Sequence, residues 1–364
     1  MKISSRAPGR ICLFGEHQDY MGFPVIAAAI DLTIHIEGEV GDGKNVSLQL
    51  DDMNETLTFS TKHFTYTREK DYFKSAVRVL QAKGLFSEKS IRARVTGTIP
   101  IQAGTSSSSA LVVAWIGFLL RSNGDPNGLL KNPTAIGELA YLSEVEEFNE
   151  SGGRMDQYTS AIGGIIHIDF RNGITATPLP IHLREFVLGD SLQPKNTQRT
   201  LKRIRNGQKE GLDELRRYLP FKDPYMLEYP RIEADLEKVS STRRPYAKAV
   251  LLNHWITEQS EQELSKTEPK TTRLADLMNL HHRILRDDLK ISTQKIETMI
   301  DAAMAAGATA AKINGSGEGG CMFAHCPGRQ EEVAEAIGGV GGRAYIINIG
   351  NGLESNTHLN PGKG

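Results

Sequence analysis

The feature that most constrains the fold is a run of small and polar residues placed directly before a strongly apolar segment. Residues 100–110 read PIQAGTSSSSA, and the segment from Ala110 to Leu120 is apolar on every side. An apolar segment of this length predicts a helix that is buried all round. Its N-terminus would turn unpaired N–H groups and the positive end of the helix dipole toward the small-residue loop. The run therefore predicts a phosphate site, and a serine-rich helix cap without a ligand is the alternative that these residues leave open.

The surrounding sequence predicts a mixed α+β fold in two lobes. Alternating apolar residues at 32–36 and 46–50 predict strands, and the Gly41-Asp42-Gly43 turn between them predicts a β-hairpin. At 364 residues the chain exceeds the size at which a single core usually stops growing. We therefore expect an N-terminal lobe, residues 1–175, that contains the predicted phosphate site, and a C-terminal lobe, residues 176–364.

Charge and cysteine content exclude several classes of protein. The formal net charge is −1, which argues against a general nucleic-acid or anionic-membrane binder. The longest apolar run is far shorter than the roughly 20 residues that span a bilayer. The three cysteines are odd in number and form no CxxC pair, which argues against a disulfide framework and against a cysteine-rich zinc site. The N-terminus lacks the apolar stretch of a secretory signal. We expect a cytoplasmic protein with no nucleic-acid partner and no membrane partner; no oligomeric state is predicted.

A second glycine-rich segment, Asn314 to Cys321, contains the spacing GxGxxG. This spacing is typical of dinucleotide-binding folds, where it joins a strand to a helix and is followed by another βα unit. Here residues 321–325 have the pattern of a strand, and too little chain follows for such a unit. The segment is therefore interpreted as a loop that shapes a nucleotide or substrate pocket, with a plain tight turn as the alternative.

Charged residues form two further clusters. Arg10, Glu16, His17 and Asp19 lie close together near the N-terminus, among glycines and apolar residues. Carboxylates and an imidazole in such a setting suit the binding of sugar hydroxyls, although a surface turn would also explain them. Asp156 lies in the segment GGRMDQ, where a carboxylate beside glycines is a candidate general base.

Taken together and in this order, these segments resemble the three signatures of the GHMP superfamily, the small-molecule kinases named for galactose, homoserine, mevalonate and phosphomevalonate. Within the superfamily the chain is most similar to the galactokinases. The resemblance covers most of the chain. The matching segments are APGRICLFGEHQDYMG at residues 7–22, PIQAGTSSSSA at 100–110, GGRMDQYTS at 152–160, LMNLHHRILRDDLKIS at 277–292 and INGSGEGGCMFA at 313–324.

Some segments depart from the galactokinase pattern. Residues 13–17, 27–30, 190–191 and 194–197 read more like mevalonate kinases. Against a mevalonate kinase, position 10 is Arg where that group usually carries Lys, and Asp19-Tyr20 fits a sugar binder. Both acceptor classes therefore stay open.

The resemblance implies ATP-dependent phosphorylation of the anomeric (C1) hydroxyl of a monosaccharide, galactose, giving a sugar 1-phosphate and ADP. Asp156 would accept or orient the hydroxyl proton, and Arg10 would stabilise the transferring group. Mg²⁺ would lie on Ser108 and Glu144, with Glu147 as the alternative ligand if the register slips. The other implied residues are Glu16, His17, Asp19 and Gly153 for the substrate, and Gly104, Thr105, Ser106, Ser107, Ser108, Ser109, Gly315 and Gly317 for ATP.

The implied fold is α+β and two-lobed, with the active site between the lobes. Three alternatives share some of these expectations. A mevalonate-type kinase would have the same ATP site but another acceptor. A kinase for another sugar (arabinose, a uronic acid or an N-acetylhexosamine) would have the same ATP site and the same phosphorylation of a sugar, and a non-catalytic sugar sensor would have only the same fold.

Overall fold

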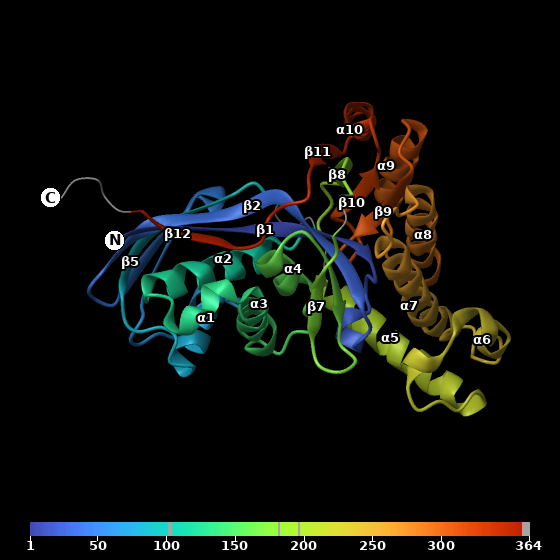
Figure 1. Cartoon of the computed structure of the whole chain (residues 1–364), viewed down its shortest axis with the longest axis horizontal. Helices are drawn as coiled ribbons and strands as arrows, with labels where there is room; N and C mark the ends of the chain where they lie inside the picture. Colours follow the sequence, from blue (N-terminus) through green and yellow to red (C-terminus); the bar gives the residue numbers. More distant parts are fainter. Residues whose placement is uncertain (101–103, 181–182, 196, 359–364) are drawn as a thin grey trace.

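The computed structural model describes residues 1–100, 104–180, 183–195 and 197–358, so residues 101–103 of the small-residue loop lie outside the described residues. The fold is mixed α and β, as predicted, and its strands form two separate sheets (Figure 1). The first sheet is built mainly from the N-terminal half, with strand order β12-β1-β2-β5-β3-β4, and β6 and β7 continue from the other part of β2. Its strands are β1 (Lys2–Phe14), β2 (Val25–Gly41), β3 (Asn45–Leu50), β4 (Glu55–Ser60), β5 (Ser90–Gly97), β6 (Ile165–Asp169), β7 (Thr175–Pro178) and β12 (Glu354–His358).

The predicted hairpin between β2 and β3 is wrong. The chain does turn between Gly41 and Asn45, but β5 lies between the two strands, antiparallel to β2 and parallel to β3. The partner of β3 in an antiparallel pair is β4. Alternating apolar residues show that a strand buries one face, but they do not show which strand lies beside it. Here β5 supplies its own buried residues, Ile91 and Val95 among them, and takes the central place.

Helices cover one face of the first sheet (Figure 1). The central one is α2, whose side chains from Ala110 to Leu120 are almost all buried, as its apolar sequence predicts. Trp115 and Phe118 stack within this core. The helices are α1 (Tyr72–Ala82), α2 (Ser107–Ser122), α3 (Pro133–Tyr141), which continues as a π-helical turn at Leu142–Glu146, and α4 (Met155–Ile162). None of the helices in the described part of the chain is both long and apolar enough to cross a bilayer.

The second lobe is richer in helix, and it packs helices around a four-stranded sheet of order β11-β8-β10-β9. The strands are β8 (Phe186–Asp190), β9 (Ala310–Asn314), β10 (Cys321–His325) and β11 (Arg343–Ile347). The helices are α5 (Thr197–Tyr218), α6 (Tyr229–Leu236), α7 (Arg244–Leu264), α8 (Thr271–Arg283), α9 (Gln294–Ala305) and α10 (Gln330–Gly339).

The lobes share a core, and one strand from the C-terminal end of the chain joins the first sheet. The ends of β1 and β2, with Ile11, Phe14 and Ile26, belong to the same buried apolar cluster as the second sheet. The last strand, β12, leaves the second lobe and pairs antiparallel with β1. A division of the chain at residue 175 therefore stays a proposal, and in that proposal β12 would be counted with the first lobe.

A buried ion pair also joins the lobes. Lys312 of β9 and Glu16, just after β1, are almost inaccessible to solvent, and Lys312 Nζ lies 2.8 Å from Glu16 Oε2. Lys312 Nζ also donates to the carbonyl oxygen of Cys12 at 2.9 Å, and Glu16 Oε1 accepts from the N–H of Gly315 at 2.8 Å. Each charge is thus satisfied by the opposite lobe. Removing one partner of such a pair leaves an uncompensated buried charge, which is strongly destabilising.

We therefore expect Lys312→Met to lower the free energy of unfolding by about 3–5 kcal/mol, because it leaves the Glu16 carboxylate buried without a counter-charge. Urea unfolding followed by circular dichroism measures this change. The double variant Lys312→Met/Glu16→Gln should recover more than half of the loss. Lys238→Ala, which breaks an exposed pair with Asp235, is the control and should change stability by no more than about 1 kcal/mol. A Lys312→Met protein as stable as the control would contradict the assignment.

Candidate active site

A cavity of about 700 Å³ lies between the lobes and collects most of the residues that the sequence singled out. Its walls come from β1 and the loop after it, the N-terminus of α2, the π-helical turn, the start of α4, the segment before α5 and the β9–β10 loop. A cavity at the junction of two lobes is the usual place for a small-molecule site. The predicted residues that line it are Arg10, Glu16, His17, Asp19, Gly104, Ser106, Ser107, Ser108, Ser109, Glu144, Gly153, Asp156 and Gly315.

Arg10 and Asp156, which are 146 residues apart in the sequence, meet in a bidentate ion pair. Arg10 Nε donates to Asp156 Oδ1 at 2.8 Å, and Arg10 Nη2 donates to Asp156 Oδ2 at 3.0 Å. Two parallel hydrogen bonds of this kind fix the carboxylate in orientation as well as in position. The Arg10 side chain is only 5% exposed, whereas that of Asp156 is 30% exposed, and both line the cavity. Asp156 thus keeps accessible surface on which it can receive a further donor.

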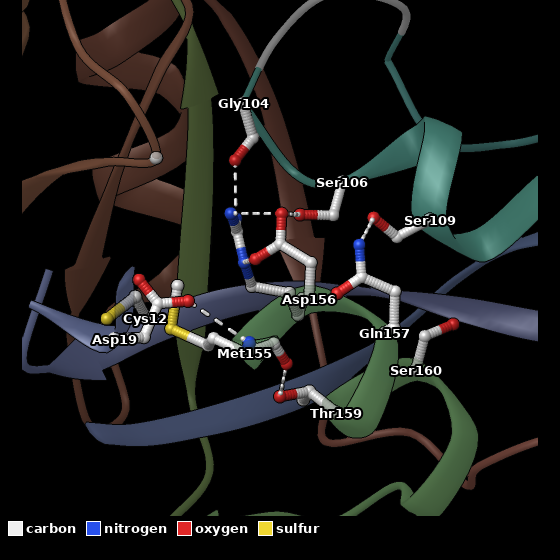
Figure 2. A network of polar contacts seen from close by, with 12 residues as sticks. Cys12, Asp19, Gly104, Ser106, Ser109, Met155, Asp156, Gln157, Thr159 and Ser160 are labelled. Carbon is white, nitrogen blue, oxygen red and sulfur yellow. Dashed lines mark hydrogen bonds and ion pairs between the residues drawn. The ribbon is translucent and has the colours of Figure 1, made fainter. Parts of the chain in front are cut away.

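Ser106 does not cap helix α2 with its side chain. It occupies the position before the helix with φ 58° and ψ 44°, and its hydroxyl makes no capping bond. Instead the hydroxyl donates to Asp156 Oδ2 at 2.6 Å (Figure 2). A residue other than glycine in the left-handed region is strained by about 1–3 kcal/mol, and such strain is concentrated at functional sites. The interpretation of the serine run as a plain helix cap is therefore wrong for Ser106.

The small-residue loop before α2 contacts the glycine-rich loop between β9 and β10. Arg10 Nη1 donates to the carbonyl oxygen of Gly104 at 2.5 Å, and Asn314 Nδ2 donates to the same oxygen at 2.9 Å. A Cβ on Gly315 would lie 2.6 Å from this oxygen, so glycine is required for the two loops to approach so closely. The two loops therefore form one continuous wall at the N-terminus of α2, where a phosphate group would meet free N–H groups.

Glu144 meets the requirements of a magnesium ligand. It is buried, lines the cavity beside Ser108 and forms no ion pair within the described residues. Burial raises the pKa of its carboxyl, and hydrogen bonds from Ser108 and Ser109 oppose that rise. Gln157 Nε2 also donates to its Oε2 at 2.7 Å. Mg²⁺ typically takes one or two protein oxygen ligands together with substrate phosphates and water, and a buried carboxylate without a counter-charge beside a hydroxyl fits that pattern.

Glu147, the alternative metal ligand, lies elsewhere. Its Oε1 accepts hydrogen bonds from the Tyr66 hydroxyl and, at 3.2 Å, from Arg78 Nη1. It is absent from the lining of the cavity as far as the described residues define it. The geometry therefore favours Glu144, which faces the serine loop from the last turn of the α3 segment.

Asp19 lies next to Gly153 and near Asp156. Its Oδ2 accepts the N–H of Met155 at 3.2 Å, as Figure 2 shows. A Cβ on Gly153 would lie 1.9 Å from the same oxygen, so only glycine allows this approach. Burial, followed by the nearby charge of Asp156, raises the pKa of Asp19 to about 6. The cavity thus contains a carboxylate that is held by backbone groups and is available to a polar ligand.

The polar side-chain atoms of Glu16 and His17 are already hydrogen-bonded to other side chains and backbone groups of the protein. Both carboxylate oxygens of Glu16 already accept hydrogen bonds, from Lys312 and from the N–H of Gly315. The His17 ring accepts from the Tyr20 hydroxyl at Nδ1, 2.9 Å away, and donates from Nε2 to the carbonyl oxygen of Ser316 at 3.1 Å; these partners assign the tautomer. Burial lowers the pKa of His17 to about 4, so the ring is neutral near pH 7.

Two predicted ATP-binding residues do not line the cavity. Thr105 is buried, and its carbonyl oxygen accepts the N–H of Arg10 at 3.1 Å. Gly317 packs against Ile291, whose Cβ would lie 2.6 Å from a Cβ on Gly317. Both residues shape the loops rather than the surface that a ligand would touch. The Asn314–Cys321 segment joins the antiparallel neighbours β9 and β10, which confirms that it is not a strand-to-helix dinucleotide loop.

Three lysines were missed as site residues. Lys70, before α1, and Lys195, between β8 and α5, line the cavity, and Lys312 fixes Glu16. The signal for Lys312 is a single charge between the apolar residues Ala311 and Ile313 of strand β9. Lys195 carries no comparable local signal, because its place in the cavity depends on how the second lobe packs on the first.

Comparison with known proteins identifies the family. The chain matches the galactokinase galactose-binding signature over residues 2–39, the GHMP kinases N-terminal domain over residues 71–164 and the GHMP kinases C-terminal domain over residues 267–341. A mevalonate kinase of Thermococcus gammatolerans is 33% identical over 361 residues, which is 96% of each chain. These matches confirm the predicted superfamily.

The solved structures give the same fold. The crystal structure of Lactococcus lactis galactokinase complexed with galactose superposes with a TM-score of 0.83 at 21% identity, covering 97% of this chain and 95% of the other. Methanococcus jannaschii mevalonate kinase superposes with a TM-score of 0.71 at 19% identity, covering 96% of this chain and 98% of the other. The chain is thus similar in sequence to mevalonate kinases and in fold to both groups. It belongs to the GHMP kinases and is a small-molecule kinase.

Proposed function

We propose that this chain phosphorylates the anomeric hydroxyl of a monosaccharide with ATP, and that galactose is the first acceptor to test. The single observation that carries the proposal is the meeting of Arg10, Asp156 and Ser106 at the wall of one cavity, beside the N-terminus of α2. A kinase has little covalent chemistry to perform, so alignment of the two substrates and electrostatic stabilisation dominate its catalysis.

Asp156 is proposed as the residue that accepts the proton of the acceptor hydroxyl. Its exposed edge faces the cavity, while Arg10 and Ser106 hold its two oxygens on the protein side. The carboxylate is therefore fixed in orientation before the acceptor arrives, which is the condition for an effective general base. The guanidinium of Arg10 would also stabilise negative charge on the transferring phosphoryl group.

The nucleotide is proposed to place its triphosphate along Gly104, the serine run 106–109 and Gly315. The free N–H groups of α2 and the hydroxyls of the loop supply donors to the phosphate oxygens. Ser108 and Glu144 would hold Mg²⁺, which when bound neutralises phosphate charge and orients the leaving group. Glu144 itself contributes a buried carboxylate, oriented by Gln157.

The acceptor is proposed to lie on Asp19 and Gly153, beside Asp156. A carboxylate there can accept hydrogen bonds from sugar hydroxyls and rejects an analogue that leaves it unpaired. Asp19 and the neutral His17 would not attract a negatively charged acceptor. This charge pattern supports a neutral sugar over mevalonate, which carries a carboxylate.

A mevalonate-type kinase is the second candidate. It is favoured by the 33% identity to a mevalonate kinase over nearly the whole chain. It requires a cation for the acceptor carboxylate, and among the described residues the lining cations are Arg10, Lys70 and Lys195. Arg10 pairs with Asp156 and Lys70 pairs with Glu150, which leaves Lys195.

A cytoplasmic location is also part of the proposal. The three cysteines are free and buried, which suits a reducing compartment.

The test is release of ADP from ATP and Mg²⁺ over a panel of acceptors: galactose, arabinose, glucose, galacturonate, N-acetylhexosamines and mevalonate. We expect turnover with a neutral sugar, and Asp156→Asn should lower kcat for that sugar by about 10²- to 10⁴-fold, because the general base is lost. The affinity for ATP should change little, since Asp156 is proposed to act on the acceptor.

Asp213→Asn, which alters an exposed carboxylate on α5, is the matched control and should leave kcat unchanged. Turnover with mevalonate and with no sugar would reject the proposed acceptor while keeping the kinase. Near-normal turnover of the Asp156→Asn protein would remove Asp156 from the mechanism.

A pH dependence follows from Asp19. Because its pKa is raised to about 6, the carboxylate is charged above that pH and becomes protonated as the pH falls through it. We expect kcat/KM for the sugar to fall below about pH 6, while the KM for ATP stays constant. Asp19→Asn should raise the KM for the sugar far more than that for ATP and should remove this acidic limb. Equal effects on both substrates would show that Asp19 is structural.

A further inference from the structure

Two buried amide side chains of the second lobe hold the backbone of the loop that follows β1. Gln208 of α5 donates from Nε2 to the carbonyl oxygen of His17 at 2.9 Å, and Asn253 of α7 donates from Nδ2 to the carbonyl oxygen of Glu16 at 2.8 Å. Both side chains are completely buried, and within the described part of the chain neither lines the active-site cavity. They therefore contact the loop from inside the second lobe rather than from the cavity.

The loop has a backbone conformation that needs such support. His17 has a φ of 63°, in the left-handed region that residues other than glycine rarely adopt. A conformation of this kind persists only where the surrounding contacts determine it. The carbonyl groups of Glu16 and His17 belong to the two peptide groups on either side of the His17 Cα. The two amides thus fix both of these peptide groups, and with them the backbone angles of His17.

Gln18 passes this position on to Asp19. Its carbonyl oxygen accepts the N–H of Met21 at 3.0 Å, which closes the short 3₁₀ turn that carries Asp19. Its side-chain amide donates to the carbonyl oxygen of Pro24 and, at 3.1 Å, to Thr257 Oγ1 of α7. The turn with the Asp19 carboxylate therefore continues directly from the two held peptide groups and is itself attached to the second lobe.

The amides at this loop do not serve packing alone. Gln18 Oε1, Gln208 Oε1 and Asn253 Oδ1 are all buried and have no hydrogen-bond partner among the described residues. A buried polar atom without a partner destabilises the folded state, and an apolar side chain of similar shape would avoid this. The fold therefore accepts a loss of stability in order to place three amide donors at one loop.

Two glycines of α5 allow these donors to reach the loop. Gly207 and Gly211 lie one turn apart, although glycine is unfavourable inside a helix. A Cβ on Gly207 would lie 2.6 Å from the ring of Tyr246, and a Cβ on Gly211 would lie 2.9 Å from the backbone nitrogen of Ala247. Helices α5 and α7 thus pack closely enough for side chains of both to contact neighbouring peptide groups of the same loop.

We propose that Gln208 and Asn253 are positioning residues for the acceptor: they fix the peptide groups around His17 and thereby hold Asp19 in place for the acceptor hydroxyls. The proposal rests on the proposed function, because it takes Asp19 as an acceptor-binding carboxylate. Neither amide touches the acceptor, and no bond or proton changes at either of them.

The test is steady-state kinetics of Gln208→Met and Asn253→Leu, singly and together, with whichever acceptor of the panel the wild-type protein turns over. Each single variant should raise the KM for the acceptor about 3- to 10-fold, and the double variant about 10- to 100-fold, because each change removes one hydrogen bond from the loop. The KM for ATP should stay within about twofold, since the nucleotide is proposed to lie on the serine run.

Stability should change much less than the KM for the acceptor. Each substitution leaves a carbonyl group without its donor, but it also removes an unpartnered amide oxygen. We therefore expect the midpoint of thermal unfolding of each single variant to shift by no more than about 4 °C. Ser260→Ala is the matched control, because Ser260 is also buried on α7 but donates only to Ile256 of its own helix, at 2.7 Å. It should keep the wild-type KM for both substrates.

Hydrogen exchange followed by mass spectrometry, without any ligand, measures the hold on the loop independently of catalysis. The backbone amides of residues 15–23 should exchange about 10-fold faster in the double variant than in the wild type, whereas those of α2 should be unchanged. Ser260→Ala should exchange like the wild type in both segments.

Several outcomes would overturn the proposal. An unchanged KM for the acceptor in the double variant would separate the two amides from the acceptor, and equal rises in the KM for the acceptor and for ATP would make them purely structural. Unchanged exchange of residues 15–23 would show that the amides do not hold the loop. If the wild-type protein turns over only mevalonate, a selective rise in the KM for mevalonate still supports the positioning role, although the proposed sugar is wrong. If it turns over no acceptor at all, the proposed function fails, and faster exchange then supports only the hold on the loop and removes its link to an acceptor.

Discussion

The bidentate contact between Arg10 and Asp156 is the interaction on which the rest of the site depends. It joins strand β1 to helix α4, and through Gly104 it also sets the position of the loop before α2. Because a guanidinium and a carboxylate fix each other in plane and distance, the proposed base and the proposed phosphate site cannot move independently. Ser106, which has a left-handed backbone, donates its hydroxyl to the same Asp156 carboxylate. The constellation is therefore organised before a ligand arrives.

The second lobe completes the site by enclosing it. The buried pair of Lys312 and Glu16 and the hydrogen bond from Asn314 to Gly104 attach the glycine-rich loop to the first lobe. Enclosure between two lobes lowers the local dielectric constant, so each remaining charge acts more strongly on a bound phosphate. Glu144 and Lys195 both line the cavity without an ion pair among the described residues, and the proposed function places Mg²⁺ beside Glu144. The proposed function therefore places a polyanion and its accompanying cation in this cavity, next to a polar acceptor.

The sequence predicted those elements of the fold that depend only on residues close together in the chain. The buried helix α2 follows from its apolar composition, and the convergence of distant segments followed from their resemblance to a known family. The pairing of β3 could not be predicted in this way, because its neighbour β5 comes from about forty residues later and alternation does not encode a partner. Nor could the sequence tell that the Ser106 hydroxyl leaves the helix end for Asp156, or that Lys312 meets Glu16, since both depend on contacts between segments far apart in the chain.

The most direct test of the central claim is a crystal structure of the protein with Mg²⁺, AMP-PNP and the acceptor that it turns over. The account predicts the triphosphate along the N-terminus of α2, and the reacting hydroxyl within about 3 Å of the Asp156 carboxylate, the distance of a short hydrogen bond. The pair of Arg10 and Asp156 should be intact in that complex. An acceptor bound with its reacting hydroxyl out of reach of Asp156, or a nucleotide bound away from the serine run, would contradict the account.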